Sequence, residues 1–364
     1  MKIVILAFAS DTHTAALKWA LERAGYSVVC WAGLSWMEDR QATLSIEQGT
    51  RVVLGRHVIE PGDVVWIRRP NPPMHNSDVT EADRDFAQTE YKWHSRSVLY
   101  LLEHLPVRCI NPYSASRVIN NKAVQLHLAS LCGFNTPASL LTNSPAEVRE
   151  FLNHPSRRAI CKSFFPHVWK KEGSEAVSVT ETFEIKVEDL PTDEVLTYAP
   201  AIYQEMIVKE ADVRTVLMGT TVYSFLLRTT NNVLDWRQEV GQGRATVKPV
   251  PTPPEVETAV LAFAQKAGIE FGSLDFAVDG DGKWWFLEIN EEGQFLWLDG
   301  FASGAGIQEK FLAFLTLPKG STREAIEAAQ SAFHSWEQFL ESPEANSVYF
   351  PEENLTAPVL SVEP

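Results

Sequence analysis

The stretch FGSLDFAVDGDGKWWFLEINEEGQF, residues 271–295, decides the fold of this chain. Two apolar runs flank the residues DGDG at 279–282, and this pattern predicts a β-hairpin with a tight turn. Alternation along the strands places Asp275 on the first strand and puts Glu288 and Asn290 together on one face of the second. The hairpin can therefore present two carboxylates and an amide oxygen to one point, and hard oxygen ligands of this kind suit Mg²⁺.

A structural role is the alternative for these residues. Glu288 would then pair with a lysine, and Asn290 would cap a turn. The apolar neighbours Phe276, Trp285 and Phe286 weigh against that alternative, because charged groups in apolar surroundings need a partner. We therefore expect a metal site on this hairpin.

The amino-terminal part of the chain shows a β-α-β pattern. An apolar run at 1–9 precedes a helix predicted from Ala15 to Ala24, and a second apolar run follows at 27–31. Strands that alternate with helices predict a parallel, doubly wound α/β domain. Further expected elements here are a hairpin at 43–59, a buried strand at 63–68, a long amphipathic helix at 79–105 and a short strand at 109–112.

The remainder of the chain divides into further units. The expected elements are helices at 116–132, 254–267 and 321–341, strands at 159–163, 213–218, 221–229, 272–278 and 283–289, and a mostly extended segment at 177–210. The residues after 341 are rich in Pro, Glu and Ser, a composition typical of a loosely ordered tail. The predicted units are residues 1–113, 114–207, 208–318 and 319–364, the last one a helix with a flexible acidic tail.

Composition and charge exclude several classes of protein. A net charge of −15 argues against a general nucleic-acid binder, which would carry a basic surface. No stretch approaches the ~20 apolar residues of a membrane span, and the amino terminus lacks a cleavage-site pattern. The four cysteines are far apart and form no CxxC pair, so they indicate neither a disulfide framework nor a zinc site. We expect a cytoplasmic protein with no membrane and no nucleic-acid partner.

The hairpin and five further segments resemble the ATP-grasp superfamily. D-x-V followed by F-L-E-I-N-x-x-G-Q is similar to its metal hairpin. Other pieces occur in the order expected for that superfamily, over about residues 1–318. They are Asn121-Lys122, Ile160-Cys161-Lys162, the run from Ile202 to Ile207, the run from Lys209 to Arg214, and Arg228 with Asp235-Trp236-Arg237. The resemblance implies an ATP-grasp fold, α+β in its ATP-binding part, with a nucleotide between two sheets.

The resemblance also implies a role for each of these residues. Lys162 and Lys122 would neutralise the phosphates of ATP, since four negative charges need converging cations. The hinge Gln204, Glu205, Met206 and Ile207 would offer backbone groups to adenine. Glu210 or Asp212 would accept from the ribose hydroxyls, with a salt bridge to Arg214 as the structural alternative. Arg228 and Arg237 would stabilise the transferring phosphoryl group, and Asp275, Glu288 and Asn290 would hold Mg²⁺.

The chemistry implied is ligation through an acyl phosphate. A substrate carboxylate attacks the γ-phosphate of ATP, and a hydroxyl or amine then displaces phosphate to leave an ester or amide. The polar loop 166–176, with Lys170, Lys171 and Gly173, is a candidate to close over the phosphates. A basic loop without that role is the alternative.

A finer resemblance is to the microviridin-type (graspetide) ligases, which macrocyclise ribosomally made peptides. Trp66-Ile67-Arg68-Arg69-Pro70 looks like their W-x-R-R-P segment, and EINEEGQFLWL from Glu288 is similar to their E-I-N-P-x-G-Q ending, with Glu291 where proline is usual. The resemblance implies a peptide substrate with leader and core, and a possible homodimer. Arg68, Arg69 and Arg214 are the candidates to hold a substrate carboxylate; a structural ion pair is the alternative for the first two.

Two other functions stay open at this point. One is a ligase that joins free amino acids or adds glutamate to a protein terminus, as the ribosomal-protein glutamate ligases do. The other is a non-catalytic ATP-binding module of the synapsin kind. ATP turnover would distinguish either ligase from the non-catalytic module. The identity of the substrate would distinguish the peptide ligase from the amino-acid or glutamate ligase.

Overall fold

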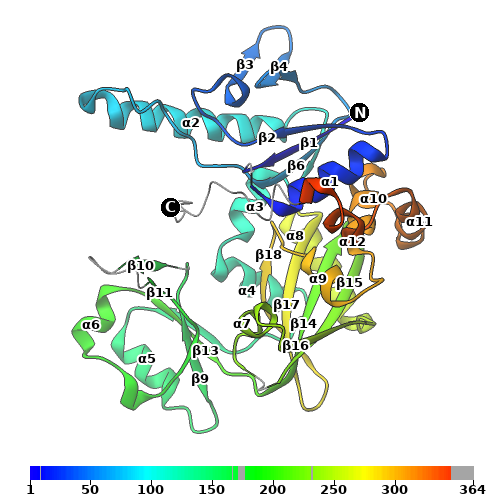
Figure 1. Cartoon of the computed structure of the whole chain (residues 1–364). Helices are drawn as coiled ribbons and strands as arrows, with labels where there is room; N and C mark the ends of the chain where they lie inside the picture. The colour runs from blue at the N-terminus through cyan, green and yellow to red at the C-terminus, as the bar shows by residue number, and fades with distance from the viewer. Residues whose placement is uncertain (9, 166, 171–176, 231–232, 346–364) are drawn as a thin grey trace.

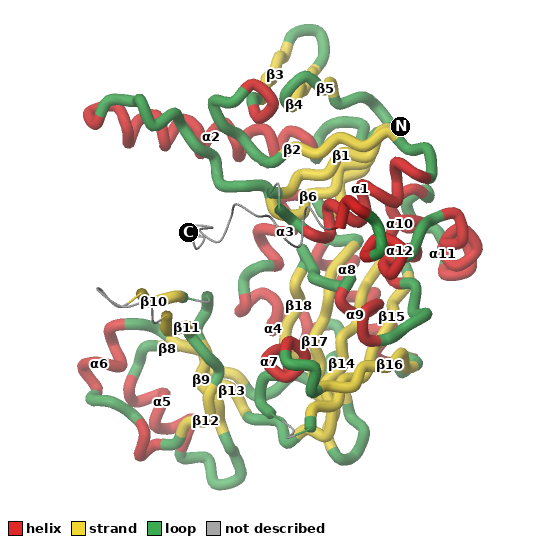
Figure 2. The backbone as a smooth tube through the Cα atoms, viewed as in Figure 1, coloured by secondary structure: helices red, strands yellow, loops and turns green. Residues whose placement is uncertain are grey.

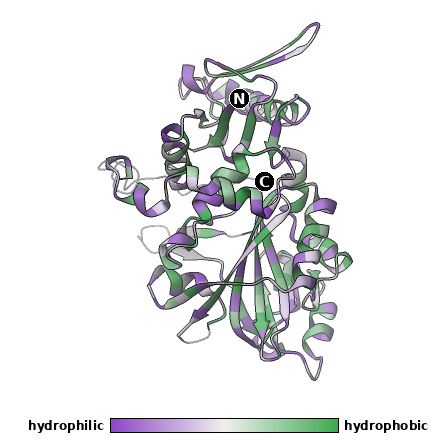
Figure 3. Cartoon of the chain, turned by 90° about the vertical axis from the view of Figure 1, so that its right-hand side faces the viewer, coloured by the Kyte–Doolittle hydropathy of each residue, from purple (hydrophilic) through white to green (hydrophobic). Residues whose placement is uncertain are grey.

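A computed structural model describes residues 1–8, 10–165, 167–170, 177–230 and 233–345. Figure 1 shows the three larger sheets of the described residues with their helices: an amino-terminal one at the top, a small one at the lower left and a long five-stranded one at the lower right. Apolar residues run along the strands, and many of the outer helical turns and loops are hydrophilic (Figure 3). The part of the chain that the structure describes contains no helix long and apolar enough to cross a membrane.

The amino-terminal sheet is parallel in strand order β2-β1-β6-β7, as the β-α-β pattern predicts. Its central strand is fully buried from Ile3 to Leu6. The Asp11 side chain accepts a hydrogen bond from the Thr14 N–H at 2.8 Å and so begins the first helix. The elements are β1 Lys2–Ala7, α1 Thr12–Arg23, β2 Ser27–Trp31, β3 Ala42–Ile46, β4 Thr50–Leu54, β5 His57–Val58, β6 Val64–Arg69, α2 Arg84–Leu102 and β7 Arg108–Ile110.

Two helices replace the single helix expected at 116–132, and that expectation was wrong. They are α3 Tyr113–Ile119 and α4 Lys122–Leu131. Asn121 separates them, because its side chain accepts from the N–H groups of Ala123 and Val124 and so starts a new helix. Both helices pack against the five-stranded sheet, although the expected boundary at 114 assigns them to the central unit.

The central unit is a small antiparallel sheet in order β12-β9-β13-β8, at the lower left of Figure 2. Its core contains Val148, Ala159, Ile185 and Tyr203. The segment 177–210, expected to be mostly extended, also contains a short helix. The elements are β8 Ser139–Thr142, α5 Pro145–Leu152, β9 Ala159–Lys162, β12 Phe183–Ile185, α6 Asp193–Tyr198 and β13 Ala201–Glu205, with a separate hairpin of β10 Val168–Lys170 and β11 Val177–Val179.

The third sheet has five antiparallel strands in order β16-β15-β14-β17-β18. The predicted DGDG turn is confirmed, since the Asp279 side chain accepts from the backbone N–H groups of Asp281 and Lys283 at 3.1 and 2.9 Å. The elements are β14 Lys209–Met218, β15 Thr221–Thr229, α7 Trp236–Gly241, β16 Ala245–Val250, α8 Pro254–Ala267, β17 Phe271–Asp279 and β18 Trp284–Asn290. Short 3-10 turns elsewhere in the chain are η1 Glu38–Arg40, η2 Glu81–Asp83 and η3 Val187–Asp189.

Short helices follow the third sheet and close the core. The single helix expected at 321–341 was wrong, because Ser335 starts a second helix by accepting from the Gln338 N–H. One continuous core joins these helices to α1 and to the third sheet. The expected flexible tail lies outside the described residues from 346 onward. The elements are α9 Trp297–Phe301, α10 Ile307–Thr316, α11 Arg323–Ala329, η4 Gln330–Ala332 and α12 Trp336–Leu340.

Candidate active site

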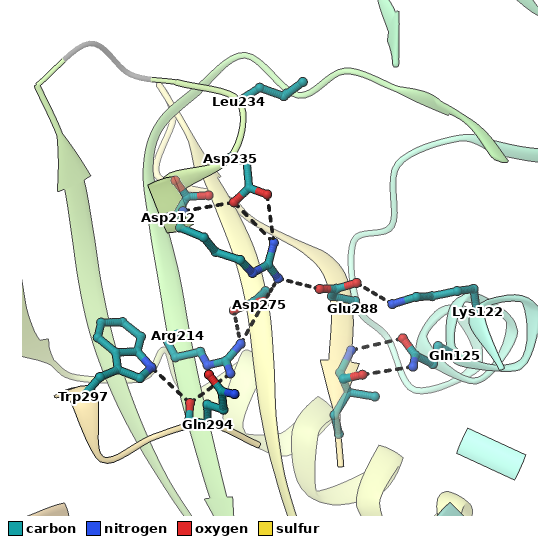
Figure 4. Close-up of polar contacts among 12 residues, drawn as sticks. Lys122, Gln125, Asp212, Arg214, Leu234, Asp235, Asp275, Glu288, Gln294 and Trp297 are labelled. Carbon is teal, nitrogen blue, oxygen red and sulfur yellow. Dashed lines mark hydrogen bonds and ion pairs between the residues drawn. The ribbon is translucent and has the colours of Figure 1, made fainter. Parts of the chain in front are cut away.

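The carboxylates of the hairpin lie on one face of the third sheet, because a register shift between Asp275 and Phe276 adds Asp275 to the face that Glu288 and Asn290 share by alternation. Asp275 on β17 is paired directly with Glu288 on β18, and Ser273 is paired with Asn290. Asp275 is 4% exposed, so its carboxylate is available only to groups on that face. The register therefore brings two carboxylates and one amide side chain to the same part of the sheet. Figure 4 shows the two acidic residues, Asp275 and Glu288.

Three cationic side chains converge on these carboxylates. Arg214 Nη1 lies 2.7 and 2.9 Å from the two oxygens of Asp275. Arg237 Nη2 donates to Asp275 Oδ2 at 3.1 Å and to Glu288 Oε1 at 2.7 Å. Lys122, at the start of α4, donates to Glu288 Oε2. Five elements of the chain, namely β14, β17, β18, α4 and α7, thus meet at one charged cluster.

The cluster keeps Glu288 ionised. Burial by itself raises the pKa of the Glu288 carboxyl, but the charges of Lys122 and Arg237 outweigh this effect and lower the pKa to about 2. The same two carboxylates hold the pKa of Arg237 above its ordinary value, against the effect of burial. Glu288 is therefore ionised at neutral pH, and Arg237 Nη2 lies between it and Asp275.

The residues present fit Mg²⁺. A single cationic nitrogen, Arg237 Nη2, already sits between Asp275 and Glu288, so a cation bound by both carboxylates has a counterpart in this structure. The donor set of carboxylate and amide oxygens suits a hard cation. The Asn290 side-chain oxygen accepts from the Glu292 N–H at 3.2 Å, which fixes its orientation. Within the described ranges, no three His, Cys, Asp or Glu side chains cluster as a metal site, so any magnesium here would depend on two carboxylates with Asn290.

Lys162 approaches the cluster from the central sheet. Its ammonium donates to Gln204 Oε1 at 3.0 Å, and Gln204 in turn donates to Ser139 Oγ at 2.8 Å. Burial lowers the pKa of Lys162 to about 8; the Glu288 carboxylate offsets part of this effect, whereas Lys122 adds to it. The Lys162 ammonium is therefore fixed on the central sheet by Gln204, and its pKa responds to the charges of the hairpin cluster.

The hinge after β13 is partly occupied by protein contacts. The Glu205 N–H donates to the Ala138 carbonyl and the Met206 N–H to the Arg158 carbonyl, both at 2.8 Å. The Glu205 carboxylate accepts from the Ala138 N–H at 3.3 Å. The structure therefore directs these two N–H groups toward the protein, and Ile207 is the hinge residue whose N–H remains a candidate for adenine.

Of the two ribose candidates, Asp212 is engaged elsewhere. Asp212 is 4% exposed and accepts from Lys209 at 2.7 and 2.8 Å. Burial raises the pKa of Asp212 to about 6, although the Lys209 charge opposes the rise. The salt bridge is thus formed with Lys209 and not with Arg214. Glu210, on the same strand, is exposed and remains the better ribose candidate.

Arg228 is not brought to the cluster. On β15, Leu227 pairs with Asp212 and Phe225 pairs with Arg214, so these odd-numbered positions share the face of the carboxylates. Arg228 is one position further and therefore extends from the opposite face, where it is exposed. Of the two arginines expected at the phosphoryl group, Arg237 is the one that contacts the hairpin in the described part of the chain.

The remaining substrate candidates differ in accessibility. Arg68 is 0% exposed, donates to the Gly293 carbonyl at 2.7 Å and lies 3.5 Å from Asp11 Oδ2. Burial lowers the pKa of Arg68 to about 10, and Asp11 opposes the shift. Arg69 is partly exposed and pairs with Glu292 at 2.8 Å. The geometry favours a structural ion pair for Arg68. Arg214 is already paired with Asp275 in the structure without substrate.

Three polar residues that the sequence did not single out hold the site together. The Gln125 amide donates to the Ile289 carbonyl at 3.0 Å and accepts from the Ile289 N–H at 3.1 Å, which fixes β18 against α4 (Figure 4). Asn111 makes the equivalent pair of bonds to Phe271. His13 Nε2 accepts from the N–H groups of Phe295 and Leu296. Each is a single polar residue whose partner lies far away in the sequence, so no local pattern reveals its role.

No family model and no curated protein matches the sequence. Several solved structures are similar in fold. A RiPP-associated ATP-grasp ligase of Chryseobacterium gregarium, in complex with ADP and a leader and core peptide, has a TM-score of 0.75 at 21% identity, over 88% of this chain and 99% of that chain. The macrocyclase MdnC of Microcystis aeruginosa MRC, bound with the precursor peptide MdnA, has a TM-score of 0.70 at 21% identity, over 86% and 99%.

A third structure is the ATP-grasp ligase PsnB, complexed with a phosphomimetic variant of a minimal precursor, Mg and ADP. Its TM-score is 0.64 at 22% identity, over 86% of this chain and 97% of that chain. The likeness extends over nearly the whole length of each of these ligases. The chain therefore has the ATP-grasp fold, as the sequence resemblance implies.

Proposed function

We propose that the protein is an ATP- and Mg²⁺-dependent ligase that forms ester or amide crosslinks between side chains of a ribosomally made precursor peptide. The observation that carries this proposal is the cluster of Asp275 and Glu288 with Arg237 between them and Lys122 beside them. The fold supports it, since the similar ligases are described with ADP, Mg and precursor peptides. We propose that the segments 1–113, 114–207 and 208–318 act together around this site, in the cytoplasm.

The chain's own residues would bind and orient the reactants. Bound Mg²⁺ would supply positive charge at the γ-phosphate. Lys122 and Lys162 would neutralise phosphate oxygens from two different elements. Asp275, Glu288 and Asn290 would hold the metal, and Arg237, which contacts both carboxylates in this structure, would stabilise the transferring phosphoryl group. A substrate carboxylate oxygen would then bond to the γ-phosphorus as ADP leaves, and a hydroxyl or amine would displace phosphate from the acyl carbon.

Phosphate release tests this function directly. The purified protein is incubated with ATP, Mg²⁺ and a short Thr-, Asp- and Glu-rich precursor peptide encoded beside its gene. We expect phosphate release in step with the loss of one water per ring, read by mass spectrometry. Phosphate release with free amino acids alone would move the assignment to the small-substrate ligase. Nucleotide binding without turnover under either condition would favour the non-catalytic module.

The pKa of Lys162 gives a pH prediction for nucleotide binding. Lys162 is charged below its pKa of about 8 and neutral above it, and the neutral amine attracts phosphate less. Between pH 7 and pH 9 we therefore expect the Kd for ATP to rise about tenfold, measured by calorimetry at constant ionic strength. Lys162→Arg, which stays charged, is the control and should abolish most of this dependence. An equal rise of the Kd in the parent protein and in Lys162→Arg would show that Lys162 does not contact the phosphates.

We also propose that a second copy of the chain docks on α2. Phe86, Trp93 and Tyr100 repeat every seventh residue of this helix and are 69%, 61% and 43% exposed. An antiparallel pair of α2 helices centred on Trp93 would put Phe86 opposite the partner's Tyr100 and would put Glu90 opposite the partner's Arg96. The aromatic contacts and the two symmetric ion pairs favour a homodimer.

The α2 interface predicts a change in mass. Trp93→Asp should convert a dimer to a monomer in light scattering at micromolar concentration, because it places two carboxylates face to face at the centre. Tyr198→Asp, at a 70% exposed aromatic on α6, is the matched control and should leave the mass unchanged. A parent protein that is already monomeric would contradict the interface.

A further inference from the structure

A pocket of about 260 Å³ opens beside the hairpin, and none of the roles assigned above uses it. It lies between the loop after β1, the segment after β18 and the start of α12. Phe8, Trp297 and Trp336 give it aromatic walls, while Ser10 and Thr12 contribute hydroxyl groups. Pockets lined by aromatic groups with a few polar ones are the usual form of a binding site.

The charged and titratable groups around the pocket are already satisfied. The Asp11 carboxylate accepts from the N–H and hydroxyl of Thr14 at 2.8 and 3.0 Å and is neutralised by the buried Arg68. His13 Nε2 accepts two backbone N–H groups. Burial, followed by the charges of Arg68, Arg69 and Arg214, holds the pKa of His13 well below its usual value, so the imidazole is neutral. The lining therefore offers aromatic faces without an unbalanced charge.

The pocket shares a wall with the catalytic cluster. The Gln294 carbonyl accepts from Trp297 Nε1 and from Arg214 Nη2, both at 3.1 Å, and Arg214 binds Asp275 (Figure 4). The Trp297 ring also lies 5.2 Å from that of Trp236, which Arg237 covers at 5.3 Å. A group held against Trp297 would thus lie next to the two arginines of the site.

The third aromatic wall comes from the helices after residue 318. Trp336 packs on Phe339 with ring centroids 5.6 Å apart, and Phe339 packs on Trp19 of α1 at 5.7 Å. Gln308 donates to the His334 carbonyl at 2.9 Å, which fixes the turn before α12. Trp336 is therefore held rigidly, and it is 5% exposed. The helices after residue 318 therefore contribute one wall of the pocket through Trp336.

We propose, on the basis of the function proposed above, that this pocket binds an uncharged aromatic or large aliphatic side chain of the peptide substrate. That side chain would lie close in sequence to the residue that reacts and would help to select it. Asp11 and Arg68 neutralise each other, so an acidic or a basic side chain would lose its hydration in the pocket without gaining an unpaired countercharge. The apolar choice is the one that the balanced lining favours.

The test uses N-acetyl-phenylalaninamide and protein labelled with 5-fluorotryptophan, without ATP. Trp297→Phe and Trp336→Phe each remove one fluorine resonance and so assign the two wall residues. We expect these two resonances to shift saturably, with a Kd of about 1–10 mM for a ligand of this size. Tighter binding of N-acetyl-lysinamide, or of the α-amide of N-acetyl-aspartic acid, than of N-acetyl-phenylalaninamide at the same resonances would overturn the choice of an uncharged side chain. No saturable shift with any of the three would overturn the pocket.

Variants separate the pocket from the ligase assignment. Ser10→Phe fills the mouth of the pocket from an exposed position and should weaken N-acetyl-phenylalaninamide binding at least tenfold, even where Trp336→Ala fails to fold. Ser156→Phe, an exposed serine in the central unit, is the matched control and should have no effect. Undiminished binding by Ser10→Phe would also overturn the site. Because the fluorine measurement contains no nucleotide, its failure leaves phosphate release as an independent test of the ligase function.

Discussion

Glu288→Gln is expected to lower kcat by about 10³, which corresponds to roughly 4 kcal/mol of transition-state stabilisation. Glutamine keeps the size of the side chain and removes the charge that would hold the metal beside Asp275. The variant should remain folded, because β18 is held by its ladder with β17 and by the two Gln125 hydrogen bonds. Combining it with Asn290→Ala removes a second oxygen ligand and should abolish turnover.

The measurement is phosphate release with the precursor peptide, together with nucleotide binding in the absence of Mg²⁺. Binding without metal should fall little, since Lys122 and Lys162 remain. Glu255→Gln is the control and should leave both measurements unchanged, because Glu255 is exposed in the first turn of α8 and belongs to no part of the site described above. Retention of ATP hydrolysis in the double variant would contradict the role of Glu288 and Asn290 as metal ligands.

The hairpin could be predicted from sequence because the pattern that forms it is local. Strand alternation alone puts Glu288 and Asn290 on one face. The pairing set by the turn, with Phe276 opposite Phe286, would place Asp275 opposite Leu287. A register shift between Asp275 and Phe276 brings Asp275 opposite Glu288 instead, and the sequence pattern did not predict that shift. Which arginine reaches those carboxylates could not be predicted in the same way. The sequence resemblance gives Arg228 and Arg237 the same expected role, and only the register of β15 with β14 shows that Arg228 extends from the other face.

Helix breaks were missed because one capping residue decides each of them. Asn121 and Ser335 sit in segments whose apolar spacing continues across the break, so periodicity predicted one helix in each case. Each side chain accepts a backbone N–H group ahead of it and starts a new helix there. The break at Ser335 matters most, since it sets the direction of α12 and so delivers Trp336 to the pocket.

The sequence could not decide whether Arg68 holds a substrate carboxylate or forms a structural ion pair, because the W-x-R-R-P motif does not indicate which of its two arginines is buried. The structure separates two neighbours: Arg68 is 0% exposed, whereas the Arg69 side chain is 29% exposed. The pairing of β6 with β1 is irregular here, since Ile67 lies opposite Leu6 and Arg69 lies opposite Ala7, which leaves Arg68 as the extra residue of a bulge. This pair therefore allows a stability test with its control in the next residue.

Arg68→Ala is expected to destabilise the protein by about 3–5 kcal/mol, because it leaves the Asp11 carboxylate buried without its partner and removes the bond to the Gly293 carbonyl. Arg69→Ala breaks a half-exposed pair with Glu292 and should cost less than about 1 kcal/mol. Both values come from urea unfolding followed by circular dichroism. Arg68→Ala with Asp11→Asn should recover part of the loss, since no unpaired charge remains. The opposite result would be equal stability of the two single variants, with a raised KM for peptide only in Arg68→Ala. That result would show that Arg68 binds the substrate, and it would mean that the loop after β18 opens in solution.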